Sequence, residues 1–73
     1  MKRRYSDIDR DSGVESYEIQ DTSITVWFKG NNRPYSYSHR KAGMQHVNRM
    51  KRLAQAGDGL NEYINDHVKK LYD

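Results

Sequence analysis

Residues 17–28 read YEIQDTSITVWF, and this stretch decides the fold. Apolar side chains alternate with polar ones on both sides of its central Asp-Thr pair, which is the pattern of two half-buried strands joined by a tight turn. A two-residue turn places Ile19 opposite Ile24 and Tyr17 opposite Val26, because the strands of a hairpin pair symmetrically about their turn. These apolar side chains then share one face of the sheet.

A third strand follows in the residues that carry Tyr35 and Tyr37. If residues 31–32 form a two-residue turn, Tyr35 lies opposite Phe28 and both tyrosines join the aliphatic face. A loop of odd length would instead turn them to the other face, beside Trp27. We expect the first alternative, in which both tyrosines fill the core.

After residue 38 the apolar residues recur with the period of a helix. A first helix is expected from Lys41 to Gly57, and a second helix from Asp58, whose side chain would cap it. The apolar stripe of the second helix contains His67, which we expect to be a hydrogen-bonded core residue. The predicted fold class is α+β, a three-stranded antiparallel β-meander followed by two helices packed on one face (β-β-β-α-α).

The N-terminal residues have a different composition from the rest of the chain. Residues 1–12 alternate basic and acidic side chains around only two apolar anchors, Tyr5 and Ile8. Such a segment buries little apolar surface, so we expect a flexible charged arm over residues 1–12. A single domain is expected over residues 13–73, with order beginning near Gly13.

Several residues between 13 and 72 follow the order of a known family. They are Tyr35, Tyr37, Gly57, Leu60, Asn61, Ile64 and Tyr72. In this order the chain resembles the KTSC domain, a small module found alone in bacterial proteins and at the C-terminus of some lysyl-tRNA synthetases. The resemblance implies one small domain with no established activity, and the synthetase context suggests RNA binding.

The charges of the chain are segregated. No acidic residue lies between Thr22 and Gly57, whereas seven of the 13 lysines and arginines fall in this window. The segments before and after the window are each net acidic. A segregated basic block in a small protein indicates an anionic partner. A solvated face that is simply rich in lysine and arginine is the alternative.

RNA or another single-stranded nucleic acid is the leading candidate for that partner, and a different anionic partner is the alternative. Trp27 is the candidate stacking residue, because strand parity places it on the face opposite the aliphatic side chains. The candidate phosphate contacts are Lys29, Arg33, Arg40, Lys41, Arg49 and Arg52. Lys41, Arg49 and Arg52 form a stripe along the expected first helix, away from its apolar side.

Two other interpretations of Trp27 stay open. An exposed tryptophan is typical of protein interfaces, so the alternative function is a protein-interaction or self-association module that uses this sheet face. The N-terminal arm could also fold over Trp27, with Tyr5 or Ile8 as the covering residue.

The chain offers little for metal binding or catalysis. Asp7, Asp9 and Asp11, followed by Glu18, imitate the ligand spacing of a calcium loop, but the required glycine is displaced to Gly13. No nucleophile motif or phosphate-binding loop occurs, and 73 residues leave little room for a water-excluding cleft. We therefore expect a binding module that is not an enzyme and has no metal and no cofactor.

The location of the protein is predicted from what the N-terminal region contains. The first charged residues are not followed by an apolar segment of the kind found in signal peptides or membrane spans. Cysteine is absent, which is consistent with a reducing compartment. A cytoplasmic protein without membrane contact is expected.

Overall fold

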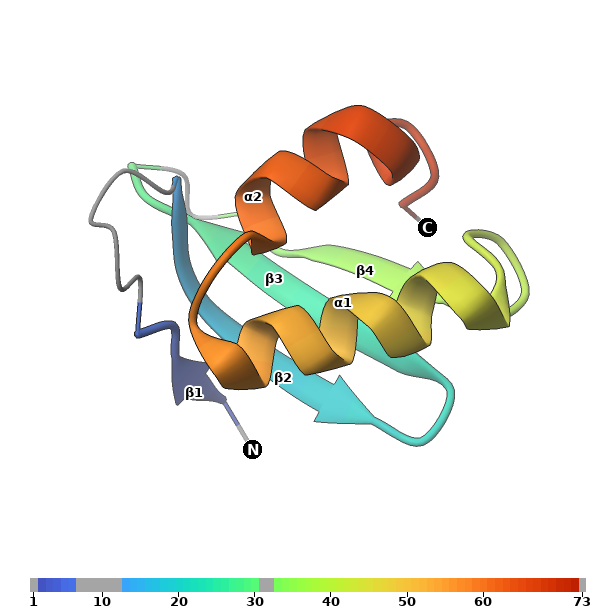
Figure 1. Cartoon of the computed structure of the whole chain (residues 1–73), viewed down its shortest axis with the longest axis horizontal. Coiled ribbons are helices and arrows are strands. Elements are labelled where there is room, and N and C mark those ends of the chain that lie inside the picture. Colours follow the sequence, from blue (N-terminus) through green and yellow to red (C-terminus); the bar gives the residue numbers. More distant parts are fainter. Residues whose placement is uncertain (1, 7–12, 31–32, 73) are drawn as a thin grey trace.

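The computed structural model describes residues 2–6, 13–30 and 33–72 of the chain. Its antiparallel sheet has four strands, arranged in the order in which they occur in the sequence (Figure 1). They are β1 (Arg3–Arg4), β2 (Val14–Gln20), β3 (Ser23–Phe28) and β4 (Tyr35–Ser38). The α+β class is confirmed, and the sheet has one strand more than the predicted three-stranded meander.

β2 and β3 pair about the turn at residues 21–22 in the predicted register. Ile19 lies opposite Ile24, and Tyr17 lies opposite Val26. A slip by one residue would have moved the apolar set to the solvent side, so the hydrophobic pattern and the turn length specify the same register. We call the face that carries these four residues the inner face and the opposite face of the sheet the outer face.

The pairing of β3 with β4 differs from the prediction by two residues. Tyr35 lies opposite Val26, and Tyr37 lies opposite Ile24. The connection between the strands covers residues 29–34 and is longer than the two-residue turn that was expected. Because a shift by an even number leaves each side chain on its own face, both tyrosines stay on the inner face, as predicted.

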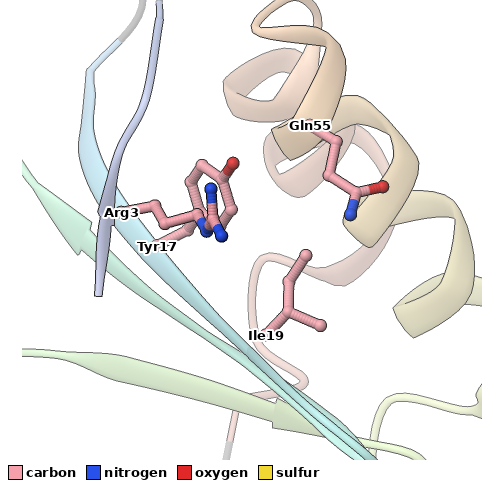
Figure 2. Close-up of a pocket in the computed structure, with 4 residues that line it drawn as sticks. All are labelled: Arg3, Tyr17, Ile19 and Gln55. Carbon is pink, nitrogen blue, oxygen red and sulfur yellow. The ribbon is translucent and has the colours of Figure 1, made fainter. Parts of the chain in front are cut away.

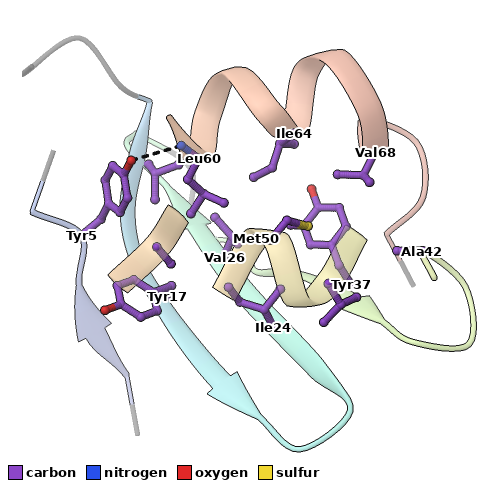
Figure 3. Packing of buried hydrophobic residues seen from close by; sticks show 13 residues of the cluster. Tyr5, Tyr17, Ile24, Val26, Tyr37, Ala42, Met50, Leu60, Ile64 and Val68 are labelled. Atoms are coloured by element: carbon purple, nitrogen blue, oxygen red, sulfur yellow. Dashed lines mark hydrogen bonds between the residues drawn. The ribbon is translucent and has the colours of Figure 1, made fainter. Parts of the chain in front are cut away.

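The N-terminal strand β1 pairs with β2, and it was not expected from the sequence. Beyond it, the backbone N–H of Tyr5 donates to the carbonyl of Glu15 at 2.9 Å. The Tyr5 side chain is 3% exposed, and its hydroxyl accepts a hydrogen bond from the N–H of Leu60 at 3.2 Å (Figure 3). The expectation that order begins near Gly13 is therefore wrong for residues 3–5, because one buried aromatic side chain anchors this charged segment. Residues 7–12 of the expected arm lie outside the described residues.

The helical elements cover the inner face of the sheet (Figure 1). They are α1 (Met44–Ala56) and α2 (Leu60–Tyr63), and α2 continues into the π-helix Ile64–Val68. Gly57 ends α1 with a left-handed backbone (φ 75°), and its N–H donates to the carbonyls of Leu53 and Ala54. The prediction of Gly57 as a helix end is confirmed.

Both helix starts differ from the predictions. α1 begins at Met44 after a turn over residues 39–42, so Lys41 precedes the helix. α2 begins after Gly59 (φ 83°) with no capping side chain, so the predicted cap by Asp58 is wrong. Glycine reaches a positive φ without the strain that a Cβ atom would add, and this sets where α2 starts.

The core lies between the inner face and the helical elements (Figure 3). Its buried hydrophobic residues are Tyr5, Val14, Tyr17, Ile24, Val26, Tyr37, Ala42, Val47, Met50, Ala54, Leu60, Ile64 and Val68. In the helical elements these residues recur at spacings of three and four, so each apolar stripe faces the sheet. No described helix covers the outer face.

Candidate nucleic-acid interface

Trp27 lies on the outer face in a row of three side chains. It pairs with Ser16 of β2, and Ser16 pairs with Arg4 of β1. Side chains directly opposite each other in antiparallel strands share a face, with Cβ atoms about 5 Å apart. The Lys2 ammonium lies over the Trp27 ring, 4.5 Å from its centroid. We call Trp27, Ser16 and Arg4, together with Lys2 above the ring, the Trp27 row. It combines a half-buried indole with two cations from the N-terminal segment.

The rest of the outer face consists mainly of short polar side chains. The hydroxyl oxygens of Thr25 and Ser36 lie 2.9 Å apart across β3 and β4. Glu18 is opposite Thr25, so the next row contains an acidic residue. Within the described strands, the cations of the outer face therefore lie beside Trp27 only.

Lys2 and Arg4 are functional candidates that the sequence reasoning missed, because both fell in the expected arm. Residues 2–4 are all basic, so the sequence has no apolar/polar alternation there that would have indicated a strand. The interpretation that the N-terminal segment covers Trp27 is correct in part. Among the described residues, Lys2 lies over the ring, whereas Tyr5 is buried in the core. Ile8, the other predicted covering residue, lies outside the described residues.

Four of the predicted phosphate contacts lie at opposite ends of the β3–β4 hairpin. Lys29 and Arg33 belong to the connection between these strands. Arg40 and Lys41 lie in the turn between β4 and α1, which is hydrogen-bonded to the turn between β2 and β3. The structure therefore does not bring these four residues together.

The other two predicted phosphate contacts, Arg49 and Arg52, lie on the solvent side of α1, and both are exposed. The buried side of α1 faces the inner face of the sheet, whereas Trp27 belongs to the outer face. Lys41 precedes α1, so the predicted helical stripe loses its first member. The seven predicted site residues thus belong to separate surfaces.

A hollow of about 540 Å³ opens on the inner side of the sheet, near the last turn of α1. Figure 2 shows its lining residues Arg3, Tyr17, Ile19 and Gln55. Arg3 and Gln55 contribute a guanidinium and an amide, and Ile19 contributes apolar surface. Among these described lining residues there is no carboxylate or imidazole, so the hollow offers hydrogen-bond donors but no acid–base pair.

The histidine predicted for the core is at the surface. His67 is exposed, and its ring stacks on that of His46 with centroids 5.8 Å apart. Nδ1 of His46 lies 2.7 Å from the hydroxyl oxygen of Tyr63. Ile64 and Val68 already supply the buried side of this segment, which leaves His67 to join a ring cluster between α1 and the C-terminal helical segment.

The calcium-like pattern of the sequence does not form a metal site among the described residues. Asp7, Asp9 and Asp11 of the calcium-like pattern lie outside the described residues, and Glu18 lies in β2. Within residues 2–6, 13–30 and 33–72, no group of three or more His, Cys, Asp or Glu side chains is placed to hold a metal ion. None of the helices in these ranges has the length and apolar composition needed to cross a bilayer.

Comparisons with known proteins do not assign the chain. No family model matches it, and neither the curated proteins nor the solved structures contain a match. The resemblance to the KTSC domain stays a prediction.

Proposed function

We propose that this chain is a small non-catalytic module that binds single-stranded RNA on the outer face of its sheet. The observation that carries the proposal is the position of Trp27, on a face without a described helix, in one row with Ser16 and Arg4. Lys2 adds a second cation directly over the indole. Aromatic side chains on open sheets stack unpaired bases, and neighbouring cations contact the phosphates.

A base that stacks on Trp27 has to displace the ammonium of Lys2. An exposed cation–π pair contributes about 0.5–1 kcal/mol. A base stacked on an aromatic side chain contributes about 1–3 kcal/mol. Stacking is therefore the stronger contact, and the displaced ammonium becomes available to a phosphate.

Electrostatics contribute less to this interface than the charge of the chain suggests. Lys2 and Arg4 line a hollow of about 490 Å³ together with Glu15, and Glu18 lies in the adjacent row. If two phosphates are neutralised, the logarithm of the affinity falls with the logarithm of the salt concentration with a slope of about 1.4 for a single strand. We expect weak binding, set mainly by stacking.

The resemblance to the KTSC domain supports RNA as the nucleic acid, through the family's occurrence in lysyl-tRNA synthetases. A cytoplasmic location, which we also propose, would give the module access to RNA. Both expectations are consistent with the Trp27 row, and neither depends on an enzymatic activity.

Titration of isotope-labelled protein with a short mixed-sequence RNA at low salt tests the proposal. We expect amide shifts at Arg4, Ser16 and Trp27, and a change in the emission of Trp27, the only tryptophan in the chain. Trp27→Ala should weaken binding about 5- to 150-fold, the equivalent of about 1–3 kcal/mol. Met44→Ala is the matched control, because Met44 is a large apolar residue that is 58% exposed on α1.

Charge reversal separates the outer face from the helix surface. Lys2→Glu with Arg4→Glu should weaken RNA binding more than Arg49→Glu with Arg52→Glu, although both pairs change the net charge equally. A larger loss from the α1 pair would contradict the outer-face interface and place the RNA on the helix.

The alternative is a protein-interaction or self-association module that uses the same Trp27 face, because tryptophan and arginine are enriched at interface hot spots. Sedimentation at increasing concentration distinguishes the two functions. A mass that rises with concentration in the wild type but not in Trp27→Ala, together with no RNA-induced shift, would replace RNA binding with self-association.

A further inference from the structure

A second candidate site lies on the helix side of the sheet. A cleft of about 390 Å³ separates the β3–β4 hairpin from the residues that follow the π-helix. Four aromatic residues line it, namely Phe28, Tyr35, Tyr37 and Tyr72. Its volume falls within the range of about 300–1,000 Å³ that small-molecule sites occupy. Because its tyrosines belong to the inner face, this cleft is separate from the Trp27 row.

The aromatic wall of the cleft is held in a defined geometry. The ring centroids of Phe28 and Tyr35 lie 5.6 Å apart, with an angle of 68° between the ring planes. Those of Tyr35 and Tyr72 lie 4.9 Å apart at 80°. Such edge-to-face packing favours fixed ring orientations, and all three side chains remain only half-buried. The wall can therefore receive a flat unsaturated ring.

Tyr37 supplies a hydrogen-bond donor to the cleft. Its side chain rises from β4 toward Ile64 and Val68 of the π-helix (Figure 3) and is 2% exposed. Burial, together with the smaller effects of the nearby Tyr35 and Tyr72, raises the pKa of Tyr37 to about 12. The Tyr37 hydroxyl therefore keeps its proton at neutral pH.

The C-terminal side of the cleft is polar and positively charged. Lys69 and Lys70 line it, and both are exposed. Asn65 adds a side-chain amide. None of the described residues that line the cleft is acidic. Ammonium groups beside an aromatic wall are suited to a ligand that joins a planar ring to an anionic group.

The polar residues of the cleft lie in the π-helix and directly after it. Asn65 and Lys70 are five positions apart, a separation that would place them about 140° apart around an α-helix. Hydrogen bonds from i to i+5 widen the turn over Ile64–Val68 and bring residues five apart closer to one side. Such turns occur frequently at functional sites. Asn65 and the two lysines all line the same cleft.

We infer that this cleft binds one mononucleotide, with the base against the aromatic wall and the phosphate at Lys69 and Lys70. The Asn65 amide and the Tyr37 hydroxyl are placed to hydrogen-bond the edge of the base, as in other sites that recognise unpaired bases. The nucleotide can be free or can be the end of a strand. This site does not depend on RNA binding at Trp27, because the two lie on different faces.

Titration of labelled protein with adenosine 5′-monophosphate tests the site, with adenosine and inorganic phosphate as the separate parts. The amides of Asn65, Lys69, Lys70 and Tyr72 should shift, and those of the Trp27 row should not. The monophosphate should bind at least about tenfold more tightly than adenosine, because its phosphate makes a charge-assisted contact to a lysine. Absence of these shifts at about 10 mM monophosphate, well above a millimolar Kd, would overturn the inference.

Paired variants show whether the phosphate lies at the two lysines. Lys69→Ala with Lys70→Ala should weaken the monophosphate about tenfold and leave adenosine almost unchanged. Arg49→Ala with Arg52→Ala is the matched control, because it removes two exposed cations from α1. Equal losses in both pairs would show non-specific attraction of the phosphate and would also overturn the site.

Two further experiments identify the source of the nucleotide and distinguish the cleft from the proposed RNA site at Trp27. A short RNA with a 5′-phosphate, compared with the same RNA without it, reports whether a strand end enters the cleft. Trp27→Ala should abolish the shifts on the outer face and preserve monophosphate binding. Loss of monophosphate binding in this variant, with the fold intact, would contradict a separate second site.

Discussion

Ile24 and Trp27 lie three residues apart in β3, on opposite faces of the same sheet. Ile24 is fully buried beneath the helical elements, whereas Trp27 is half-buried beside a lysine and a row of polar side chains. Strand alternation allows one short segment to stabilise the fold with one side chain and to present a recognition surface with another. Among the described elements, the helices cover the face of Ile24 and leave the face of Trp27 without a helix.

The largest expected effect is on stability, and it should separate the two faces. Ile24→Ala removes a fully buried side chain from the inner face, and should lower the free energy of unfolding by about 2–5 kcal/mol. Trp27→Ala removes a half-buried ring and one cation–π contact, and should cost about 1 kcal/mol. Urea denaturation of both variants measures the difference. A cost at Trp27 equal to that at Ile24 would show that the indole is a core residue.

A smaller loss of stability is expected from the contact between Tyr5 of the N-terminal segment and Leu60 of α2. Tyr5→Phe keeps the ring but leaves the buried N–H of Leu60 without its acceptor, at a cost of about 1–3 kcal/mol. Tyr63→Phe is the matched control, because its hydroxyl pairs with His46 near the surface, where water can replace it. Thermal unfolding of both variants checks this order. Equal costs would mean that Tyr5 anchors the segment by its ring alone.

The smallest effect at neutral pH concerns Tyr37, and it grows in alkaline solution. Burial raises its pKa from 10.0 to about 12, so between these values the unfolded chain loses the proton while the folded chain keeps it. The contribution of Tyr37 to stability is therefore present below pH 10 and is lost as the pH rises toward 12. Urea midpoints of the wild type and Tyr37→Phe, compared at about pH 9 and about pH 11.5, measure this share. The difference between the two urea midpoints should change between these pH values. A difference that stays constant would argue against a buried hydroxyl.

Local pattern predicted the centre of the fold well. The register of β2 with β3, the inner position of Tyr35 and Tyr37, and the end of α1 at Gly57 all follow from alternation and turn chemistry. The predicted register of β3 with β4 was wrong by two residues. The turn was expected to contain two residues, whereas the connection between the strands covers residues 29–34. The predicted starts of α1 and α2 were also wrong. Each helix begins later than expected, directly after a glycine with a positive φ.

The candidate site was predicted less well than the fold. Trp27 was assigned to the correct face. Lys2 and Arg4 were missed because the charged N-terminal segment was expected to be a flexible arm. The single buried ring of Tyr5 supplies that order, and a hydrogen bond to a residue 55 positions away cannot be inferred from neighbouring residues. The cluster of Lys69 and Lys70 with the aromatic cleft was missed as well, because residues far apart in the sequence line this cleft together.

The sequence by itself determined which side chains of each strand share a face, because the period of a strand is a local property of the backbone. It also determined that basic residues would be concentrated in the middle of the chain. The placement of both helical elements on the inner face was also predicted and is confirmed. Only the tertiary structure decided that the basic residues are divided among separate surfaces. Residues that are close together in the sequence can lie on opposite sides of a sheet once the chain is packed, so a cluster of charges in the sequence does not have to form one surface.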